Sequence, residues 1–148
     1  MSALTTSRIA RGAVVAVIAG GTVAGAVSLS AAAPAATSHT LTFNASQVAD
    51  HIIGFQDIAA DVDKQNGKVV GYDTTDCHMN TQTKTAHCEV TLARANGTMR
   101  GWIHLDLNSG LATGTVTGGT RAYHGVTGTI SGKAVSNNAT AVTIRYHS

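Results

Sequence analysis

The residues best suited to chemistry form a polar run near the middle of the chain. Arg100, Trp102, His104 and Asp106 occupy every second position. Alternate side chains of a strand share one face and lie about 6.5–7 Å apart. If this face lined a cavity, His104 could act as an acid or base near neutral pH, oriented by a carboxylate. If it faced outward, it would meet water or a neighbouring subunit while the apolar residues between Met99 and Leu107 filled the interior. The sequence leaves both orientations open.

A second titratable group precedes this run. His51, Asp57 and Asp61 lie beside the apolar stretch 52–55. Burial next to apolar side chains raises the pKa of a carboxyl and makes it a useful acid; a solvated strand or loop is the alternative. The candidates for catalysis are therefore Asp57, Asp61 and His104, and those for ligand binding are Arg100, Trp102, Asp106 and Tyr123.

The sequence lacks the residues that a metal site, a serine nucleophile or a phosphate-binding loop would require. His87 and Glu89 would share one strand face, but no third and fourth ligand accompany them, so we expect no metal and no cofactor. No serine occupies a nucleophile elbow. The glycine-rich stretch 114–130 lacks the Gly-Lys-Ser/Thr of a phosphate loop. Tyr123 and Tyr146 are more typical of packing residues than of catalytic acids.

Short strands must position these residues. Alternating residues predict strands over 39–43, 69–74, 87–94, 98–107, 111–117, 126–134 and 142–146. Turn sequences separate them at Asn66-Gly67, Asn96-Gly97, Asn108-Ser109-Gly110 and Asn137-Asn138. The segment 45–64 is ambiguous. Val48, Ile52 and Phe55 have helical spacing after a Ser46 N-cap, whereas 57–63 reads as extended.

Seven or eight short strands with regular turns predict a sandwich or a barrel. No helical crossover separates consecutive strands, so we expect antiparallel pairing. Closure into a barrel would remove the exposed edges of the sheet. Gly118-Gly119 marks a corner at which a Cβ would obstruct the bend.

The first 35 residues have the pattern of a signal peptide. Arg8 and Arg11 precede an uncharged run over 12–29, and Ala33-Pro34-Ala35 offers small residues for cleavage before Ala36. A retained membrane anchor is the alternative, since the run is roughly long enough to span a bilayer. We expect cleavage and secretion, leaving a single domain over 36–148.

Charge and cysteine content narrow the partners and the compartment. Two of the ten Lys and Arg lie in the signal segment, so the remaining eight balance the eight Asp and Glu. This balance argues against a nucleic-acid partner, and we expect no membrane partner after cleavage. Cys77 and Cys88 are the two cysteines. In an exported protein they predict a disulfide, here across the base of a polar hairpin loop over 78–87.

The glycine-rich corner carries a family resemblance. The stretch Gly118-Gly119-Thr120-Arg121-Ala122-Tyr123-His124-Gly125-Val126-Thr127-Gly128-Thr129 resembles the G-G-T-G-x-Y-x-G-A-x-G-x signature of the allene oxide cyclase and dirigent barrel superfamily. Upstream, 66–72 and Cys77 look like its G-x-x-V-G … C strand, and Cys88 falls where exported bacterial members often have a second cysteine. The likeness covers roughly 57–146; departures at Arg121, His124, Val126 and Thr127 fall around the corner. It implies an eight-stranded antiparallel barrel with a central cavity, often oligomeric.

The resemblance also implies classes of function. Allene oxide cyclases steer ring closure of a fatty-acid epoxide with a cavity glutamate and a bound water, but the single glutamate, Glu89, does not match that position. Dirigent proteins steer the coupling of phenoxy radicals with cavity aspartates, and Asp57 and Asp61 lie in the region where such acids occur.

Three functional hypotheses follow. The first is a secreted barrel that binds a small apolar molecule and steers its reaction geometry. The resemblance adds that such a barrel can form a homo-oligomer. The second is an isomerase or cyclase for a lipid-like or polyketide-like substrate, in which Asp57, Asp61 or His104 moves a proton. The third is a structural or interaction barrel whose lumen is filled by side chains.

Overall fold

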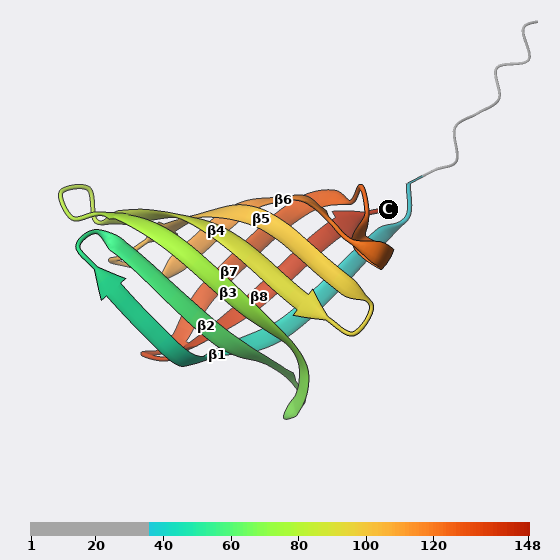
Figure 1. Cartoon of the computed structure of the whole chain (residues 1–148), viewed down its shortest axis with the longest axis horizontal. Coiled ribbons are helices and arrows are strands. Elements are labelled where there is room, and N and C mark those ends of the chain that lie inside the picture. Colours follow the sequence, from blue (N-terminus) through green and yellow to red (C-terminus); the bar gives the residue numbers. More distant parts are fainter. Residues whose placement is uncertain (1–35) are drawn as a thin grey trace, which may run out of the picture. The chain divides into compact units, whose positions relative to one another are not determined.

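The computed structural model describes residues 36–148, whose strands close into an antiparallel barrel (Figure 1). The strands are β1 (Ser38–Ile53), β2 (Gln56–Gln65), β3 (Lys68–Asn80), β4 (Thr85–Arg94), β5 (Gly97–Asp106), β6 (Leu111–Gly119), β7 (Thr127–Ser136) and β8 (Ala139–His147). Each strand pairs with the next, and β8 returns to pair with β1. The eight-stranded antiparallel barrel is therefore confirmed. The predicted signal peptide lies outside the described residues.

The ambiguous segment is sheet, and the helical alternative is wrong. β1 continues to Ile53 and pairs with β2, with a register shift between Gln47 and Ala49. Val48, Ile52 and Phe55 are 64, 58 and 58% exposed, so their spacing does not mark a buried helix face. The bulge breaks the alternation that would otherwise have identified a long strand.

The hairpin between β2 and β3 turns as its sequence predicts. Asn66 and Gly67 both have positive φ, at 52° and 77°, which a two-residue hairpin turn with the twist of its strands requires. The next hairpin is longer than expected, because most of 78–87 is sheet and the turn is confined to residues 81–84. Cys77 and Cys88 lie opposite each other in this hairpin and form the predicted disulfide.

One end of the barrel is closed by an apolar plug. Its buried side chains are Phe43, Leu92, Met99, Val116, Tyr123, Val126, Ile130 and Ile144. Tyr123 belongs to the 3-10 turn η1 (Arg121–Tyr123), which follows β6 and lies near the C-terminus in Figure 1. Its ring packs edge-on against Tyr146, 5.8 Å between centroids. The Gly118-Gly119 corner brings η1 to this end, and Thr120 N donates to Thr98 O at 2.8 Å.

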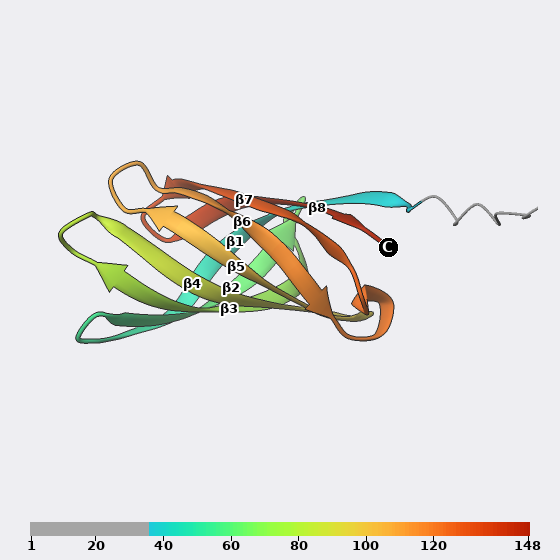
Figure 2. The ribbon, with the colours of Figure 1, turned by 90° about the horizontal axis from the view of Figure 1, so that it is seen from above.

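The strands are tilted, so those of the front wall run at an angle to those of the back wall (Figures 1 and 2). Alternate residues of each strand point inward, such as Met99 on β5, which is 2% exposed. The part of the chain that the structure describes has no helix with the length and apolar character needed to cross a membrane.

Candidate functional site

A cavity of about 320 Å³ occupies the barrel on the open side of the plug. Phe43, Leu92, Met99, Ile130 and Ile144 line its inner part. Residues of the β5–β6 and β7–β8 turns line its mouth, among them Leu107, Gly110, Asn137 and Asn138. Because β4 to β8 contribute mainly apolar and small side chains, most of the wall suits an apolar ligand.

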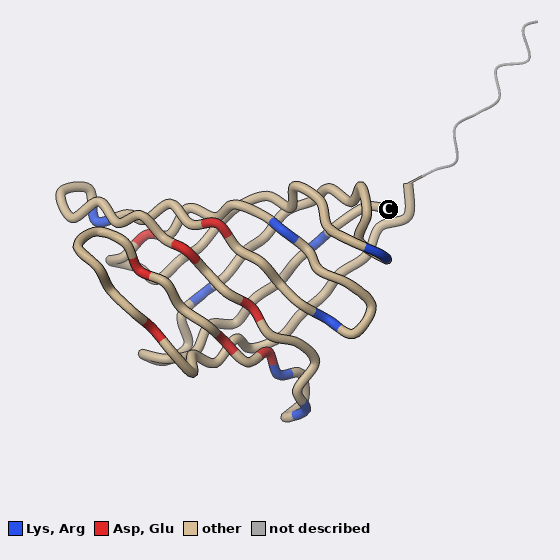
Figure 3. Tube along the Cα trace, viewed as in Figure 1, with Lys and Arg blue, Asp and Glu red and all other residues tan. Residues whose placement is uncertain are grey.

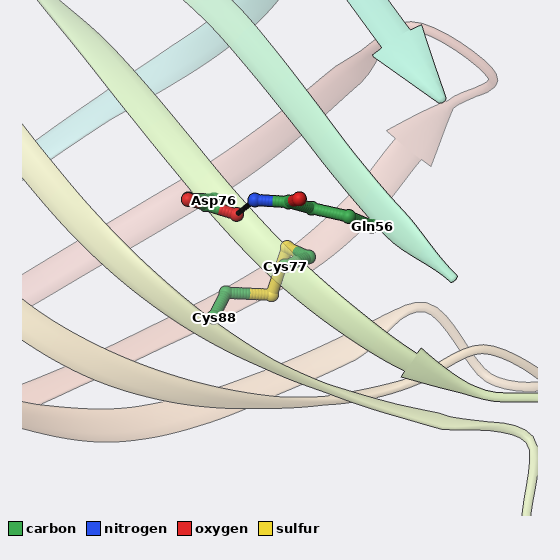
Figure 4. The surroundings of a disulfide bond; sticks show 4 residues. All are labelled: Gln56, Asp76, Cys77 and Cys88. Atoms are coloured by element: carbon green, nitrogen blue, oxygen red, sulfur yellow. Dashed lines mark hydrogen bonds between the residues drawn. A yellow bond between two sulfur atoms is a disulfide. The ribbon is translucent and has the colours of Figure 1, made fainter. Parts of the chain in front are cut away.

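The disulfide is part of this wall. Both cysteines line the cavity, and Cys88 is fully buried. In Figure 4 the bridge lies between β3 and β4, with Gln56 and Asp76 on the neighbouring outward positions. The cross-link thus ties together two strands that form one side of the cavity.

The polar part of the wall comes from β2 and β3. Asp57 and Asp61 on β2 and Asp73 on β3 line the cavity. Asp61 lies directly opposite Asp73 in the strand register, so the two side chains share the inner face. Figure 3 shows acidic residues along β2, β3 and β4, which carry six of the eight Asp and Glu of the chain, whereas β6, β7 and β8 carry none. The cavity therefore has one acidic side and one apolar side.

Burial changes the acidity of the facing pair. It raises the pKa of Asp61 to about 7, helped by the negative charge of Asp73 and a hydrogen bond with it. It also raises the pKa of Asp73 to about 7, helped by a hydrogen bond with Asp63 and that carboxyl's charge. Two ionised carboxylates repel, whereas a proton on one lets it donate to the other. The pair can thus hold or release a proton near neutral pH.

A third carboxyl and an arginine lie behind the pair. Asp63 is completely buried, and burial raises its pKa, while a hydrogen bond from Asp73 and the charge of Arg94 act in the opposite direction. With all carboxyls ionised, neither oxygen of Asp63 has a hydrogen-bond partner in the described residues; a proton on Asp73 supplies one. Of the three acids, Asp63 is the one whose pKa the positive charge of Arg94 lowers.

The arginine is anchored by an aromatic ring. The Arg94 guanidinium lies 5.0 Å from the centre of the Phe43 ring, a cation–π contact. Its buried Nε and Nη2 have no hydrogen-bond partner among residues 36–148. Neither Arg94 nor Asp63 lines the cavity, so both are positioning residues for the acids in front of them.

Asp57 lies nearer the mouth, opposite Cys77 in the register. Burial raises its pKa, and the charge of Asp50 adds to the effect. Its buried Oδ1 has no hydrogen-bond partner within the described chain. Asp57 is therefore a second acidic group that a ligand entering the cavity would meet.

The other candidates from the sequence do not join this group. Trp102 and His104 are exposed and do not line the cavity, because the alternate residues of β5 point inward. Arg100 belongs to the wall but is exposed. Asp106 lies at the mouth, where its Oδ1 accepts hydrogen bonds from the Asn108 and Ser109 amides at 2.8 and 3.2 Å.

Two further candidates lie away from the cavity. His51 is exposed on β1 and does not line it. Tyr123 is 3% exposed inside the plug and does not line it either. Of the two orientations considered for the face with Arg100, Trp102, His104 and Asp106, the described residues therefore show the one in which this face points outward.

Sequence reasoning missed Asp73, Asp63 and Arg94. One signal was available: the positions of Asp57, Asp61 and Asp63 differ by even numbers, so on a strand the three side chains share a face. The partnership with Asp73 and Arg94 depends on pairing between strands, which the sequence does not display.

Comparisons with known proteins bear on the fold. No family model and no curated protein matches the chain. Among solved structures, pyocyanin demethylase is 22% identical, with a TM-score of 0.63 over 73% of this chain and 99% of that one. A pterocarpan synthase dirigent protein is 16% identical, with a TM-score of 0.60 over 75% and 95%. The chain shares its closed eight-stranded barrel fold with these proteins.

The same barrel fold occurs in AbnU, an exo-specific intermolecular Diels-Alderase. It is 10% identical, with a TM-score of 0.58 over 76% of this chain and 99% of that one. At such identities the similarity establishes architecture alone.

Proposed function

We propose that this protein is an exported barrel that holds a small apolar molecule in its lumen and steers the geometry of its reaction. One observation carries the proposal: the Asp61–Asp73 pair, with pKa values of about 7, faces an otherwise apolar cavity of about 320 Å³. Cavities of roughly 300–1,000 Å³ with a few placed polar groups are typical of small-molecule sites. Barrels of this fold include a dirigent protein and a Diels-Alderase.

The apolar wall and the acidic side have different tasks in this proposal. The wall holds the ligand in one conformation, which lowers the entropic barrier to a reaction within it. Asp61 contacts the ligand and donates or accepts a proton. Asp73 exchanges that proton with it, and Arg94 keeps the negative charge on Asp63. A pKa near 7 suits both directions of transfer at neutral pH.

This acid pair supports the isomerase or cyclase hypothesis as the second candidate function. Passive binding needs no titratable group, whereas moving a proton during cyclisation or isomerisation needs one within reach of the ligand. A purely structural barrel would gain little from two carboxyls in its lumen, because burying them costs free energy. Asp57 and Asp61 are the proposed catalytic residues, with Asp73 as the partner of Asp61.

Export and self-association complete the proposal. A cross-strand disulfide suits an oxidising compartment outside the cytoplasm. Val48, Ile52, Ile53 and Phe55 on the β1–β2 hairpin are each 58–64% exposed. An exposed apolar group of this kind is typical of an interface, which supports a homo-oligomer formed through this hairpin. Light scattering of the purified protein, with Phe55→Ser as the comparison, tests it.

The test of the lumen uses a neutral fluorescent probe. We expect 1-aminoanthracene to bind the purified protein with a fluorescence increase that saturates at one equivalent per chain. Val90 lines the cavity, so Val90→Phe should fill part of it and weaken binding at least tenfold. Val135 is 60% exposed, so Val135→Phe is the matched control and should bind as the natural protein does.

The test of chemistry uses native mass spectrometry after exposure to culture extract. We expect a retained lipophilic mass in the natural protein and in Asp61→Asn, since the carboxyl-to-amide change preserves the shape of the cavity. If the barrel isomerises or cyclises that molecule, the ligands released from the natural protein and from Asp61→Asn should have the same mass but different chromatographic retention. Equal probe binding by Val90→Phe and the natural protein would overturn the proposal of a ligand in the lumen.

A further inference from the structure

Three histidines form a row across neighbouring strands on the outer face of the barrel. His78 on β3 lies directly opposite His87 on β4, and His87 lies directly opposite His104 on β5. All three are exposed. Cys77 and Cys88 precede and follow the first pair and point inward, so the histidines point outward. We propose that this histidine row is a surface site for a divalent transition metal that prefers imidazole ligands, with Cu²⁺ the tightest.

The spacing across the strands suits shared coordination. The Cα atoms of Cys77 and Cys88 are 3.9 Å apart, which marks a narrow pair of the antiparallel ladder. Wide and narrow pairs alternate, so His78–His87 is a wide pair at about 5.5 Å and His87–His104 a narrow one at about 4.5 Å between Cα atoms. Metal–imidazole bonds of about 2.0–2.1 Å can therefore reach one ion from both neighbours of His87.

Binding requires the imidazoles to turn toward one another. In their present rotamers, no three His, Cys, Asp or Glu side chains within 36–148 converge on a point suited to a metal ion. The three histidines are exposed, and exposed side chains change rotamer within nanoseconds. The strands, which are fixed by the barrel and by the adjacent disulfide, hold the three Cα positions while the rings adjust.

Carboxylates flank the row on the same outer face. Asp76 and Glu89 lie opposite each other, two residues along from His78 and His87. Asp76 accepts a hydrogen bond from Gln56 Nε2 at 2.8 Å, drawn as the dashed line in Figure 4. Their negative charge attracts a cation to this face. On β5, Trp102 separates His104 from Arg100. Arg100 is the positive charge nearest to His104 on that strand, and it would repel a metal ion.

Strand register supplies what a single strand lacks. Along one strand His87 has only Glu89 as a second ligand, so the sequence predicts no metal site. Pairing adds His78 from one side and His104 from the other. Imidazole suits Cu²⁺, Zn²⁺ and Ni²⁺, and among the divalent first-row metals Cu²⁺ has the highest affinity for such ligands.

The same face contains its own reporter. Trp102, the single tryptophan of the chain, stacks on the His87 ring with centroids 5.1 Å apart. A Cu²⁺ ion bound through His87 would quench its fluorescence. We expect CuCl₂, added to the purified oxidised protein in a non-chelating buffer, to quench Trp102 and to saturate at one equivalent with a micromolar Kd.

Variants of exposed residues test the site without disturbing the barrel. His87→Asn and His104→Asn should each raise the Kd for Cu²⁺ at least tenfold. His124→Asn, which removes an exposed histidine outside the row, should leave it unchanged. Electron paramagnetic resonance of the 1:1 complex should show coupling to at least two imidazole nitrogens. Quenching that does not saturate, or that all three variants affect equally, would overturn the proposal. Neither result bears on the lumen.

Discussion

Asp61 faces Asp73 because of an irregularity in the β2–β3 pairing. Next to the turn Lys64 pairs with Val69, but beyond a register shift Asp63 pairs with Gly71, and Asp61 consequently pairs with Asp73. Without the extra residue on β3, Asp61 would lie opposite Tyr72, and Asp73 would point to the other face of the sheet. A single bulge thus converts two separate acids into a pair that can share a proton inside the cavity.

This pair makes stability depend on pH in a definite direction. The folded protein keeps protons on Asp61 and Asp73 up to about pH 7, whereas unfolded aspartates release them near their ordinary pKa of 3.8. The folded state therefore binds more protons between these values, and its stability falls as pH rises through that window. Asp73→Asn, which cannot ionise, should be more stable than the natural protein at pH 8 by roughly 1–2 kcal/mol.

Urea unfolding at pH 5 and pH 8 measures this difference. The advantage of Asp73→Asn should shrink at pH 5, where the natural carboxyl is largely protonated. Glu89→Gln, on the exposed outer face of β4, is the control and should show no such advantage. A natural protein that gains stability from pH 5 to pH 8 relative to Asp73→Asn would contradict the raised pKa.

Arg94 and Asp63 should be energetically coupled. Arg94→Met keeps an apolar side-chain stem of similar length but removes the positive charge that stabilises the ionised form of the fully buried Asp63. An uncompensated buried polar group costs about 1–3 kcal/mol, and more when it is charged. We expect Arg94→Met to lose at least that much at pH 8, and Asp63→Asn in the same chain to restore most of it. A double-mutant cycle measures the coupling; purely additive effects would show that the two groups act independently.

Local patterns were sufficient to predict antiparallel strands in a sandwich or a barrel, and the resemblance at the glycine-rich corner favoured the eight-stranded barrel. Alternation in 87–94 and 98–107 and the Asn66-Gly67 turn are short-range features, and each specifies its own strand or turn. The segment 45–64 stayed ambiguous because the bulge at Gln47–Ala49 interrupts its alternation and its apolar residues are exposed. Apolar residues at helical spacing normally indicate a buried helix face, but Val48 and Phe55 are exposed on the sheet.

The site was predictable only in part, since it depends on how strands pair. Asp57 and Asp61 could be singled out from their apolar neighbours, and both line the cavity. Asp73 could not be joined to Asp61 without knowing the bulge on β3. The orientation of the β5 run was open because its two faces are equally regular; the burial of Met99 shows which face is inner.

Removing the disulfide should lower stability without abolishing the fold. Cys77 and Cys88 are eleven positions apart, and closing a loop of this length is worth about 2–3 kcal/mol in the chain-entropy model. Cys77→Ala with Cys88→Ala should therefore lower Tm by roughly 10 °C or more in a domain of this size. Calorimetry without reductant measures it.

The control for the disulfide is the natural protein under mild reductant. Both sulfurs are buried, so the folded natural protein should resist reduction and keep its Tm at short incubation. A double variant that melts at the natural temperature would show that the barrel needs no cross-link.

Gly119 should tolerate no side chain. A Cβ at this position would lie 2.2 Å from the Thr98 carbonyl oxygen and 2.7 Å from the Tyr123 Cβ, and the first of these is backbone that also accepts the Thr120 amide. Gly119→Val would have to push η1 off the end of the barrel and expose the plug, so we expect insoluble or unfolded protein. Gly54→Asn is the matched control: its φ of 63° suits asparagine, nothing lies within 4 Å of its Cβ, and it should melt within a few degrees of the natural protein. Circular dichroism and thermal melting of the soluble fractions compare them, and a cooperatively melting Gly119→Val barrel would mean that this corner can open without loss of the fold.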